Sequence, residues 1–328
     1  MLKYLSSIFS FRTVQFIGRP AKGFVRTIAL VLALVGLAEV ASRSMVGRVG
    51  HRWEYWDKLA AVKFEEYRKQ VSAERAPDIV IIGDSTGARD FDPLSMASSS
   101  LQGLDIYNLA WPANFPLALR VTTFPLLKEP YRSPKIVMVS LSPGSFTDNR
   151  RVKEFEQEIL ASTYCQHMLG KYSLADRFYL PRIRNSMPFV IDMYKPRSEF
   201  EQMRQSRGFM PAEGKAEDYQ SSNANVSQVL ESDRFGVMVE LAQLSRHRNF
   251  KLVIVIPPVT ERADADTALV YNDYLRRLRS AQTEFGFIIL DMRHSTFLSP
   301  EQYTDGIHLT REGAVLFSKE LARRLYSL

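Results

Sequence analysis

From residue 79 onward, short apolar runs alternate with longer segments of helical periodicity. Each run is rich in β-branched residues and bounded by Gly, Pro, Asn or Asp, which is typical of buried strands. The predicted strands are Ile79–Ile82, Leu104–Leu109, Ile136–Leu141, Leu252–Ile256 and Phe287–Leu290. The predicted helices are Phe115–Leu127, Phe235–Arg246, Asp266–Phe285 and Thr310–Leu328. This alternation predicts a three-layer α/β/α fold, with helices on both faces of a mostly parallel sheet.

Residues 150–233 interrupt this alternation. They carry weakly helical patterns and then a polar stretch, Pro211–Ser222, without a strand signal. We predict a helical insertion with a mobile loop, which is a candidate lid.

A different pattern occupies the N-terminus, where Thr27–Ala38 is twelve residues long and uncharged. A membrane-spanning helix needs about 20 apolar residues, and the flanking arginines at positions 26 and 43 lengthen the span by snorkelling. A cleaved signal peptide and a buried core helix are the alternatives to an uncleaved signal anchor. Five basic residues precede the run and three follow it, so the N-terminus is expected in the cytoplasm and the main domain outside.

The predicted organisation therefore has four parts. Residues 1–26 form a basic cytoplasmic segment, 27–45 the transmembrane anchor, 46–75 a juxtamembrane amphipathic helix, and 76–328 the main domain. Trp53, Tyr55 and Trp56 fit an interfacial aromatic belt, and the same helix also fits packing on a core.

The charge distribution supports this topology. The 328-residue chain is 45% hydrophobic and 24% charged, which excludes a disordered or collagen-like protein. Its net charge of +7 lies wholly in residues 1–52, which hold eight basic residues and one acidic residue. The remaining chain carries 35 of each sign, so nucleic acid is not an expected partner.

The sequence contains no recognisable metal-binding or cofactor-binding motif. Cys165 is the only cysteine, and the histidines show no metal-ligand spacing. Gly83 and Gly87 lack the Lys-Ser/Thr that follows in a phosphate-binding loop. We expect neither a metal nor a cofactor.

The first strand runs directly into Gly83-Asp84-Ser85. A serine placed there lies on a turn at the carboxyl edge of the sheet, where its hydroxyl is exposed and backbone N–H groups can stabilise an oxyanion. The alternative is an ordinary strand-to-helix turn in which Asp84 or Ser85 caps the helix.

Asp305 and His308 stand three residues apart just before the last helix. One short loop can present both side chains, so that the carboxylate orients the imidazole and the imidazole accepts a proton from a serine hydroxyl. The alternative is a surface histidine beside a turn-closing aspartate.

Together the two motifs resemble those of the SGNH, or GDSL-like, hydrolases over roughly residues 76–328. The resemblance implies a triad of Ser85 as nucleophile, His308 as base and Asp305 as its orienting partner. Gly83 and Asp84 are the supporting positions of the first motif.

Two further blocks of that family supply oxyanion donors, and this sequence departs from both. Where the second block has Gly, the chain has Asn108-Leu-Ala110, and Ala110 retains a backbone N–H. Where the third block has an Asn side chain, the chain has Ser142-Pro. The resemblance implies an oxyanion hole formed by Ser85, Ala110 and Ser142.

Several shorter features resemble the DltD-like branch, the membrane-anchored proteins of teichoic-acid D-alanylation. They are the single anchor, Ser142-Pro143 with Phe146, Phe91-Asp-Pro93, Val255-Ile-Pro-Pro258 and Asp305-Gly-Ile-His-Leu309. The Gly-Asp-Ser of the first motif is similar to that of the alginate-acetylation type.

The implied function is that of an extracytoplasmic serine acyltransferase or esterase that acts on a cell-envelope polymer or glycan. The acyl group would be D-alanyl or acetyl, and a membrane-bound O-acyltransferase (MBOAT) would be the natural partner. Two alternatives stay open: a non-catalytic accessory protein that presents substrate to such an enzyme, and a lipase- or thioesterase-type hydrolase.

Overall fold

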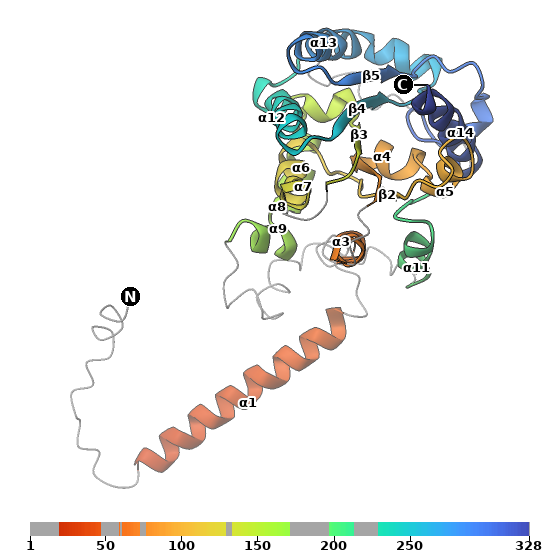
Figure 1. Cartoon of the computed structure of the whole chain (residues 1–328). Coiled ribbons are helices and arrows are strands. Elements are labelled where there is room, and N and C mark those ends of the chain that lie inside the picture. The colour runs from red at the N-terminus through yellow and green to blue at the C-terminus, as the bar shows by residue number, and fades with distance from the viewer. Residues whose placement is uncertain are drawn as a thin grey trace. The chain divides into compact units, whose positions relative to one another are not determined.

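The structure is a computed structural model of the chain and describes residues 20–46, 59, 61–72, 77–128, 133–170, 197–212 and 229–327. The chain divides into two units, residues 1–51 with 173–194 and residues 52–172 with 195–328. The described part of the first unit is helix α1 (Pro20–Val46) (Figure 1), and the second unit holds the sheet.

All five predicted strands form one parallel sheet in the order β2-β1-β3-β4-β5. Their bounds are β1 (Ile79–Gly83), β2 (Ile106–Asn108), β3 (Ile136–Ser140), β4 (Lys251–Ile256) and β5 (Ile288–Asp291). In this order the chain leaves β1 toward one edge and then returns to build the other, so the switch point lies between β1 and β3. A ligand site is expected at the carboxyl ends of these two strands.

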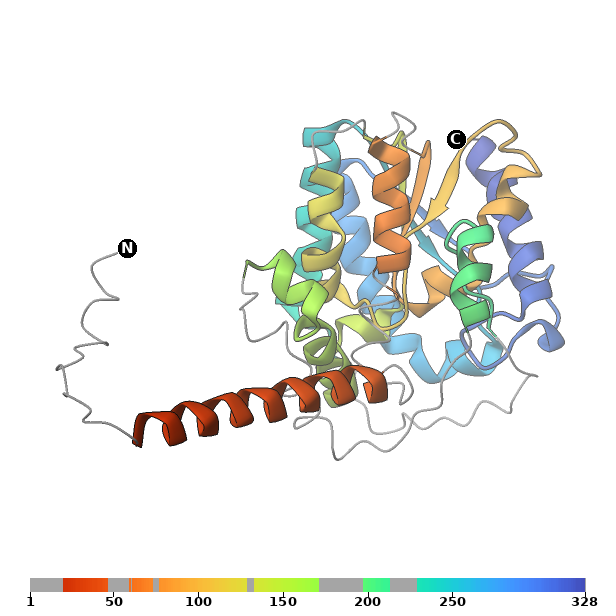
Figure 2. The same cartoon turned by 90° about the horizontal axis from the view of Figure 1, so that it is seen from below.

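Helices cover both faces of the sheet (Figure 2), which confirms the predicted fold class. One face carries α6 (Pro116–Thr122), α7 (Phe124–Lys128), α12 (Ser232–Arg248) and α13 (Glu261–Phe285). The other carries α4 (Ser85–Asp90), α5 (Pro93–Ala97) and α14 (Arg311–Tyr326). Right-handed crossovers explain the division, because the step to β2 runs opposite to the later steps.

One predicted helix differs from the structure. Phe115–Leu127 is expected as a single helix and is instead divided at Thr123 into α6 and α7. Pro125 has no N–H to donate to the carbonyl four residues before it, so a continuous helix loses a hydrogen bond there.

The carboxyl ends of β1 and β3 approach very closely at Gly83. This glycine has φ +144°, and a Cβ on it would lie 1.7 Å from the carbonyl oxygen of Ser140. A side chain would therefore force the two strands apart. Immediately before it, Ile79–Ile82 are fully buried, as expected for a strand covered on both faces.

The described residues of the insertion are helical, with α8 (Arg150–Leu160), α9 (Thr163–Met168) and α11 (Arg197–Gln205). After α11 the chain returns to the sheet: the N–H of Asn108 donates to the Arg207 carbonyl, and that of Met210 to the Ala88 carbonyl. Residues 213–222 of the predicted polar stretch lie outside the described part, so the lid remains a prediction.

The described part of the juxtamembrane segment belongs to the second unit. A π-helical turn (Ala61–Glu65) continues into α3 (Glu66–Ser72). Phe64, Tyr67 and Val71 are buried in the hydrophobic core of this unit. The packing interpretation therefore applies to residues 61–72, whereas the three aromatic residues at positions 53–56 lie outside the described residues.

Helix α1 is long and apolar enough to cross a membrane. Its segment Gly23–Ala41 has a mean hydropathy of 2.1. With 27 residues at about 1.5 Å each, the helix is about 40 Å long, more than the roughly 30 Å hydrocarbon core of a bilayer. The helix begins before Thr27, so the span is not limited to the twelve-residue run.

Candidate active site

Ser85 is the first residue of helix α4, directly after the carboxyl end of β1. Asp84 is the N-cap of this helix, and its carboxylate accepts a hydrogen bond from the N–H of Thr86 at 2.9 Å. The capping interpretation and the exposed serine therefore coexist: Asp84 fixes the turn, and Ser85, which is partly exposed, stands at its apex.

The structure brings the three predicted triad residues together. His308 Nε2 lies 2.8 Å from Ser85 Oγ, across 223 residues of sequence. His308 Nδ1 lies 2.7 Å from Asp305 Oδ2. This chain of hydrogen bonds suits transfer of a proton from the hydroxyl to the imidazole, with the carboxylate facing the other ring nitrogen.

The loop that carries Asp305 and His308 is held in shape by its own hydrogen bonds. Asp305 Oδ1 accepts from the N–H groups of Ile307 and His308, each at 2.8 Å, which leaves Oδ2 for the imidazole. Tyr303 and Leu309 pair as an isolated antiparallel bridge at the base of the loop. Burial would raise the pKa of Asp305, but the hydrogen bond and positive charge of His308 outweigh it, so this pKa is lowered.

Asp84 also links the nucleophile turn to the loop that follows β3 and contains Ser142 and Ser145, which we call the third loop. Its Oδ2 accepts from the N–H of Ser142 at 2.9 Å, from Ser142 Oγ at 3.0 Å and from Ser145 Oγ at 2.7 Å. Oδ1 accepts from both the N–H and the hydroxyl of Thr86. The carboxylate is buried, and five hydrogen bonds satisfy it.

The loop that follows β2 and contains Ala110, which we call the second loop, is held in place by the side chain of Asn108. Its Nδ2 donates to the carbonyls of Gly87 and Phe91, each at 2.9 Å. Its Oδ1 accepts from the N–H of Ala110 at 3.0 Å. The amine of the fully buried Lys63 donates to the Ala110 carbonyl, and burial lowers the pKa of this lysine well below its usual value.

These contacts bear on the predicted oxyanion donors. The N–H of Ala110 donates to Asn108 and that of Ser142 to Asp84, so both are engaged inside the protein. Of the three predicted residues, only Ser85 has a backbone N–H without a hydrogen-bond partner among the described residues. The oxyanion hole of Ser85, Ala110 and Ser142 stays a prediction, and in this arrangement side chains of the protein accept from two of the three N–H groups.

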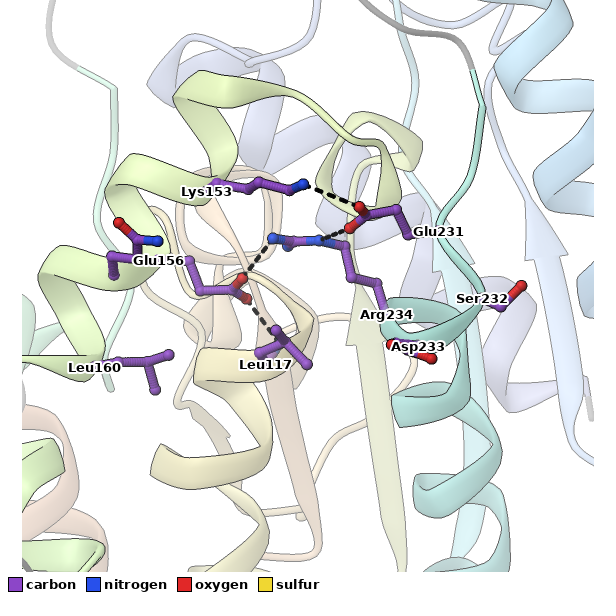
Figure 3. Close-up of a pocket in the computed structure, with 9 residues that line it drawn as sticks. Leu117, Lys153, Glu156, Leu160, Glu231, Ser232, Asp233 and Arg234 are labelled. Carbon is purple, nitrogen blue, oxygen red and sulfur yellow. Dashed lines mark hydrogen bonds and ion pairs between the residues drawn. The ribbon is translucent and has the colours of Figure 1, made fainter.

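A cavity of about 560 Å³ lies between α6, α8 and α12 (Figure 3), and no triad residue lines it. Its wall contains a buried ion pair, with Arg234 Nη2 2.7 Å from Glu156 Oε2. Arg234 also donates to the carbonyl of Ser145, and Glu156 accepts from the N–H groups of Leu117 and Ala118. Burial raises the pKa of Glu156 despite this pairing. Through the hydrogen bond from Arg234 to the Ser145 carbonyl, the ion pair therefore stabilises the third loop.

Several residues that shape the site carry no recognisable signal in the sequence. Ser145 and Lys63 act on the loops through contacts that no local motif encodes. Asp90, the last residue of α4, is buried and accepts from the N–H of Leu309 at 2.9 Å. Arg234 lies at the start of α12 with nothing in its neighbourhood to distinguish it from a surface arginine.

No protein-family model matches the sequence, and no curated protein matches it. Similar solved structures include one described as a lipolytic protein of the G-D-S-L family from Desulfitobacterium hafniense (12% identity, TM-score 0.37, covering 75% of this chain and 97% of that one). Others are the acetyl xylan esterase AlAXEase (11%, 0.36, 76% and 98%) and Axe2, an acetylxylan esterase from Geobacillus stearothermophilus (9%, 0.38, 75% and 93%). At these identities and TM-scores the likeness assigns no activity to this chain.

Proposed function

We propose that this protein is a membrane-anchored serine esterase or acyltransferase that acts on O-acyl groups of a cell-envelope polymer or glycan. The observation that carries the proposal is the hydrogen-bond chain from Ser85 through His308 to Asp305. It joins the two ends of the domain at the carboxyl edge of β1, where the sheet's switch point predicts a ligand.

In the proposed reaction, Ser85 Oγ attacks an acyl carbonyl while His308 Nε2 accepts the hydroxyl proton. Asp305 stabilises the imidazolium, and the Ser85 N–H lies beside the developing oxyanion. Collapse of the intermediate releases the first alcohol, which takes the proton from His308, and leaves the acyl group on Ser85. Water or an acceptor hydroxyl then repeats these steps and removes the acyl group.

Helix α1 supports the envelope location. A single apolar helix preceded by basic residues would leave residues beyond it outside the cytoplasmic membrane. There an acyl group would reach the domain from a multispanning partner such as a membrane-bound O-acyltransferase. A reporter fused to the C-terminus should be active only outside the cytoplasm, and cytoplasmic activity would contradict this part of the proposal.

The reaction itself is tested with the full chain in detergent. We expect hydrolysis of p-nitrophenyl acetate, and faster loss of the acetyl group when a glycan acceptor is added. Ser85→Ala should remove both activities. Ser98→Ala is the matched control, because Ser98 follows α5 and its hydroxyl donates only to the Ser95 carbonyl. A glycan that does not accelerate turnover identifies a hydrolase rather than a transferase.

The engaged N–H groups of Ala110 and Ser142 favour a second candidate, a non-catalytic accessory protein that binds an acylated glycan. Under this alternative, the chain would bind the glycan with equal affinity before and after Ser85→Ala and would show no ester turnover. Isothermal titration with O-acetylated and deacetylated oligosaccharides distinguishes the two candidates.

A further inference from the structure

A second carboxyl group lies beside the candidate triad and has no role in the mechanism above. Asp90 ends helix α4, five residues after Ser85, and is fully buried. Its Oδ1 accepts the N–H of Leu309, the residue after His308, at 2.9 Å. Its Oδ2 is buried and has no hydrogen-bond partner among the described residues.

The carboxyl group of Asp90 has a single hydrogen-bond partner among the described residues. Phe91, the next residue, packs edge-to-face on Phe317 of α14 with ring centroids 5.2 Å apart. From α14, Ser318 Oγ donates to the backbone carbonyl of Asp90 rather than to its carboxyl group. No ion pair with Asp90 occurs in the part of the chain that the structure describes.

The charged and titratable groups that face Asp90 come from two elements. Arg89 precedes it on α4, and the loop before α14 contributes Tyr303, Asp305 and His308. Burial raises the pKa of Asp90 to about 7, although the charge of His308 and the hydrogen bond from Leu309 act in the opposite direction. The group therefore changes charge near neutral pH.

A buried carboxyl group whose second oxygen has no hydrogen-bond partner lowers the free energy of unfolding. An apolar residue at this position would avoid the cost of removing the carboxyl group from water. The position of Asp90 gives it an effect that an apolar residue would lack. Through Leu309 it fastens the histidine loop to the helix that begins with the nucleophile, and its charge acts on His308 across the protein interior.

We propose that Asp90 is a positioning residue of the triad, which in its ionised form holds the histidine loop against α4 and stabilises the His308 imidazolium formed during acyl transfer. This inference rests on the proposed function. When Ser85 gives its proton to His308, the positive charge is then balanced by two carboxylates rather than one. Protonation of Asp90 removes the second charge and weakens the acceptor of the Leu309 N–H.

The test compares Asp90→Asn with wild type over a range of pH. Asparagine keeps an oxygen for the Leu309 N–H and removes the charge. With p-nitrophenyl acetate and the full chain in detergent, we expect kcat/KM to fall about tenfold at about pH 8.5, where Asp90 is ionised. At about pH 5.5, where wild-type Asp90 is protonated, the variant and wild type should agree within about twofold.

Asp92→Asn is the matched control, since Asp92 lies two residues away and its carboxylate accepts from Leu94 and Ser95. Its ratio to wild type should not vary with pH. If the Asp90→Asn ratio is equally constant, Asp90 has only a structural role and the inference is wrong, while the proposed function stands.

A second measurement does not depend on turnover. With ¹³C at Cε1 of histidine, and His308→Gln to identify the resonance, the pH dependence of the His308 signal should differ between wild type and Asp90→Asn, because the charge of Asp90 acts on the imidazole. Superimposable pH profiles in the two proteins would overturn the inference whatever the activity. Different profiles in a protein without ester turnover would retain the coupling and refute the proposed function.

Discussion

The two sides of Ser85 differ in how their polar groups are used. Toward the histidine loop, the hydroxyl meets His308 at 2.8 Å and the imidazole meets Asp305 at 2.7 Å. Toward the second and third loops, the N–H groups of Ala110 and Ser142 donate to side chains of the protein. On the side of the histidine loop, Ser85, His308 and Asp305 form the hydrogen-bond chain that the motifs predict; we call this the assembled side. On the other side, the N–H groups expected to bind an oxyanion are already bonded to side chains of the protein; we call this the closed side.

This contrast follows from the side chains that lie beside the two N–H groups. Here Ala110 is bound by its neighbour Asn108, and Ser142 shares the Asp84 carboxylate with Ser145. The Asn108 amide thus engages the N–H of Ala110, and the Asp84 carboxylate beside the nucleophile engages that of Ser142.

The largest expected effect is on the assembled side. His308→Ala should lower the rate of acyl transfer by about 10³-fold or more, because the hydroxyl of Ser85 then loses its base. Steady-state kinetics with p-nitrophenyl acetate measure this. His294→Ala is the control, since that side chain is exposed and its one ion-pair contact among the described residues is with Asp264. Equal activities of the two variants would contradict the assigned base.

Gly83→Ala tests the close approach of the carboxyl ends of β1 and β3, next to Ser85. The new Cβ would meet the Ser140 carbonyl, and the backbone φ of +144° is unfavourable for alanine, so we expect a loss of about 4 kcal/mol or more in unfolding free energy. Gly236→Ala, with open space inside α12, should instead gain about 0.5–1 kcal/mol. Urea denaturation compares them, and a Gly83→Ala variant of wild-type stability would refute the close approach.

The stability of the protein should depend on the protonation state of Asp90. Because its folded-state pKa is about 7 and its unfolded value is about 4, the folded protein holds this proton more tightly. The unfolding free energy should therefore fall by roughly 3–4 kcal/mol as pH rises from about 4 to about 7. Asp90→Asn has no such proton and should lack this fall. Parallel denaturation curves for both proteins at every pH would contradict the burial of an ionisable group.

The smallest effect is expected on the closed side. Ser142→Ala removes one hydroxyl from the Asp84 carboxylate but keeps the backbone N–H, so it should cost about 1 kcal/mol in unfolding free energy. Activity should stay within about threefold of wild type. A loss as large as that of His308→Ala would show that the Ser142 hydroxyl, and not only the triad, acts on the substrate.

Much of the fold, and the grouping of Ser85, His308 and Asp305, could be predicted because their signals are local. Ile79–Ile82 is a continuous apolar run, and Asp305 and His308 lie within one short loop. The hydrogen-bonded loops could not be predicted, because Asp84 meets Ser142 across 58 residues and Asp90 meets Leu309 across 219. Lys63 was missed for a related reason: a lysine in an amphipathic helix is expected on the exposed face, whereas this one is buried against a carbonyl.

Covalent labelling of the serine shows whether His308 activates the hydroxyl of Ser85. The full chain in detergent is treated with a fluorophosphonate, and the site of modification is read by peptide mass spectrometry. We predict a single adduct on Ser85 whose formation is lost in His308→Ala and retained in His294→Ala. An unmodified Ser85 under conditions that label a control serine hydrolase, or equal labelling in His308→Ala, would show that His308 does not activate the Ser85 hydroxyl.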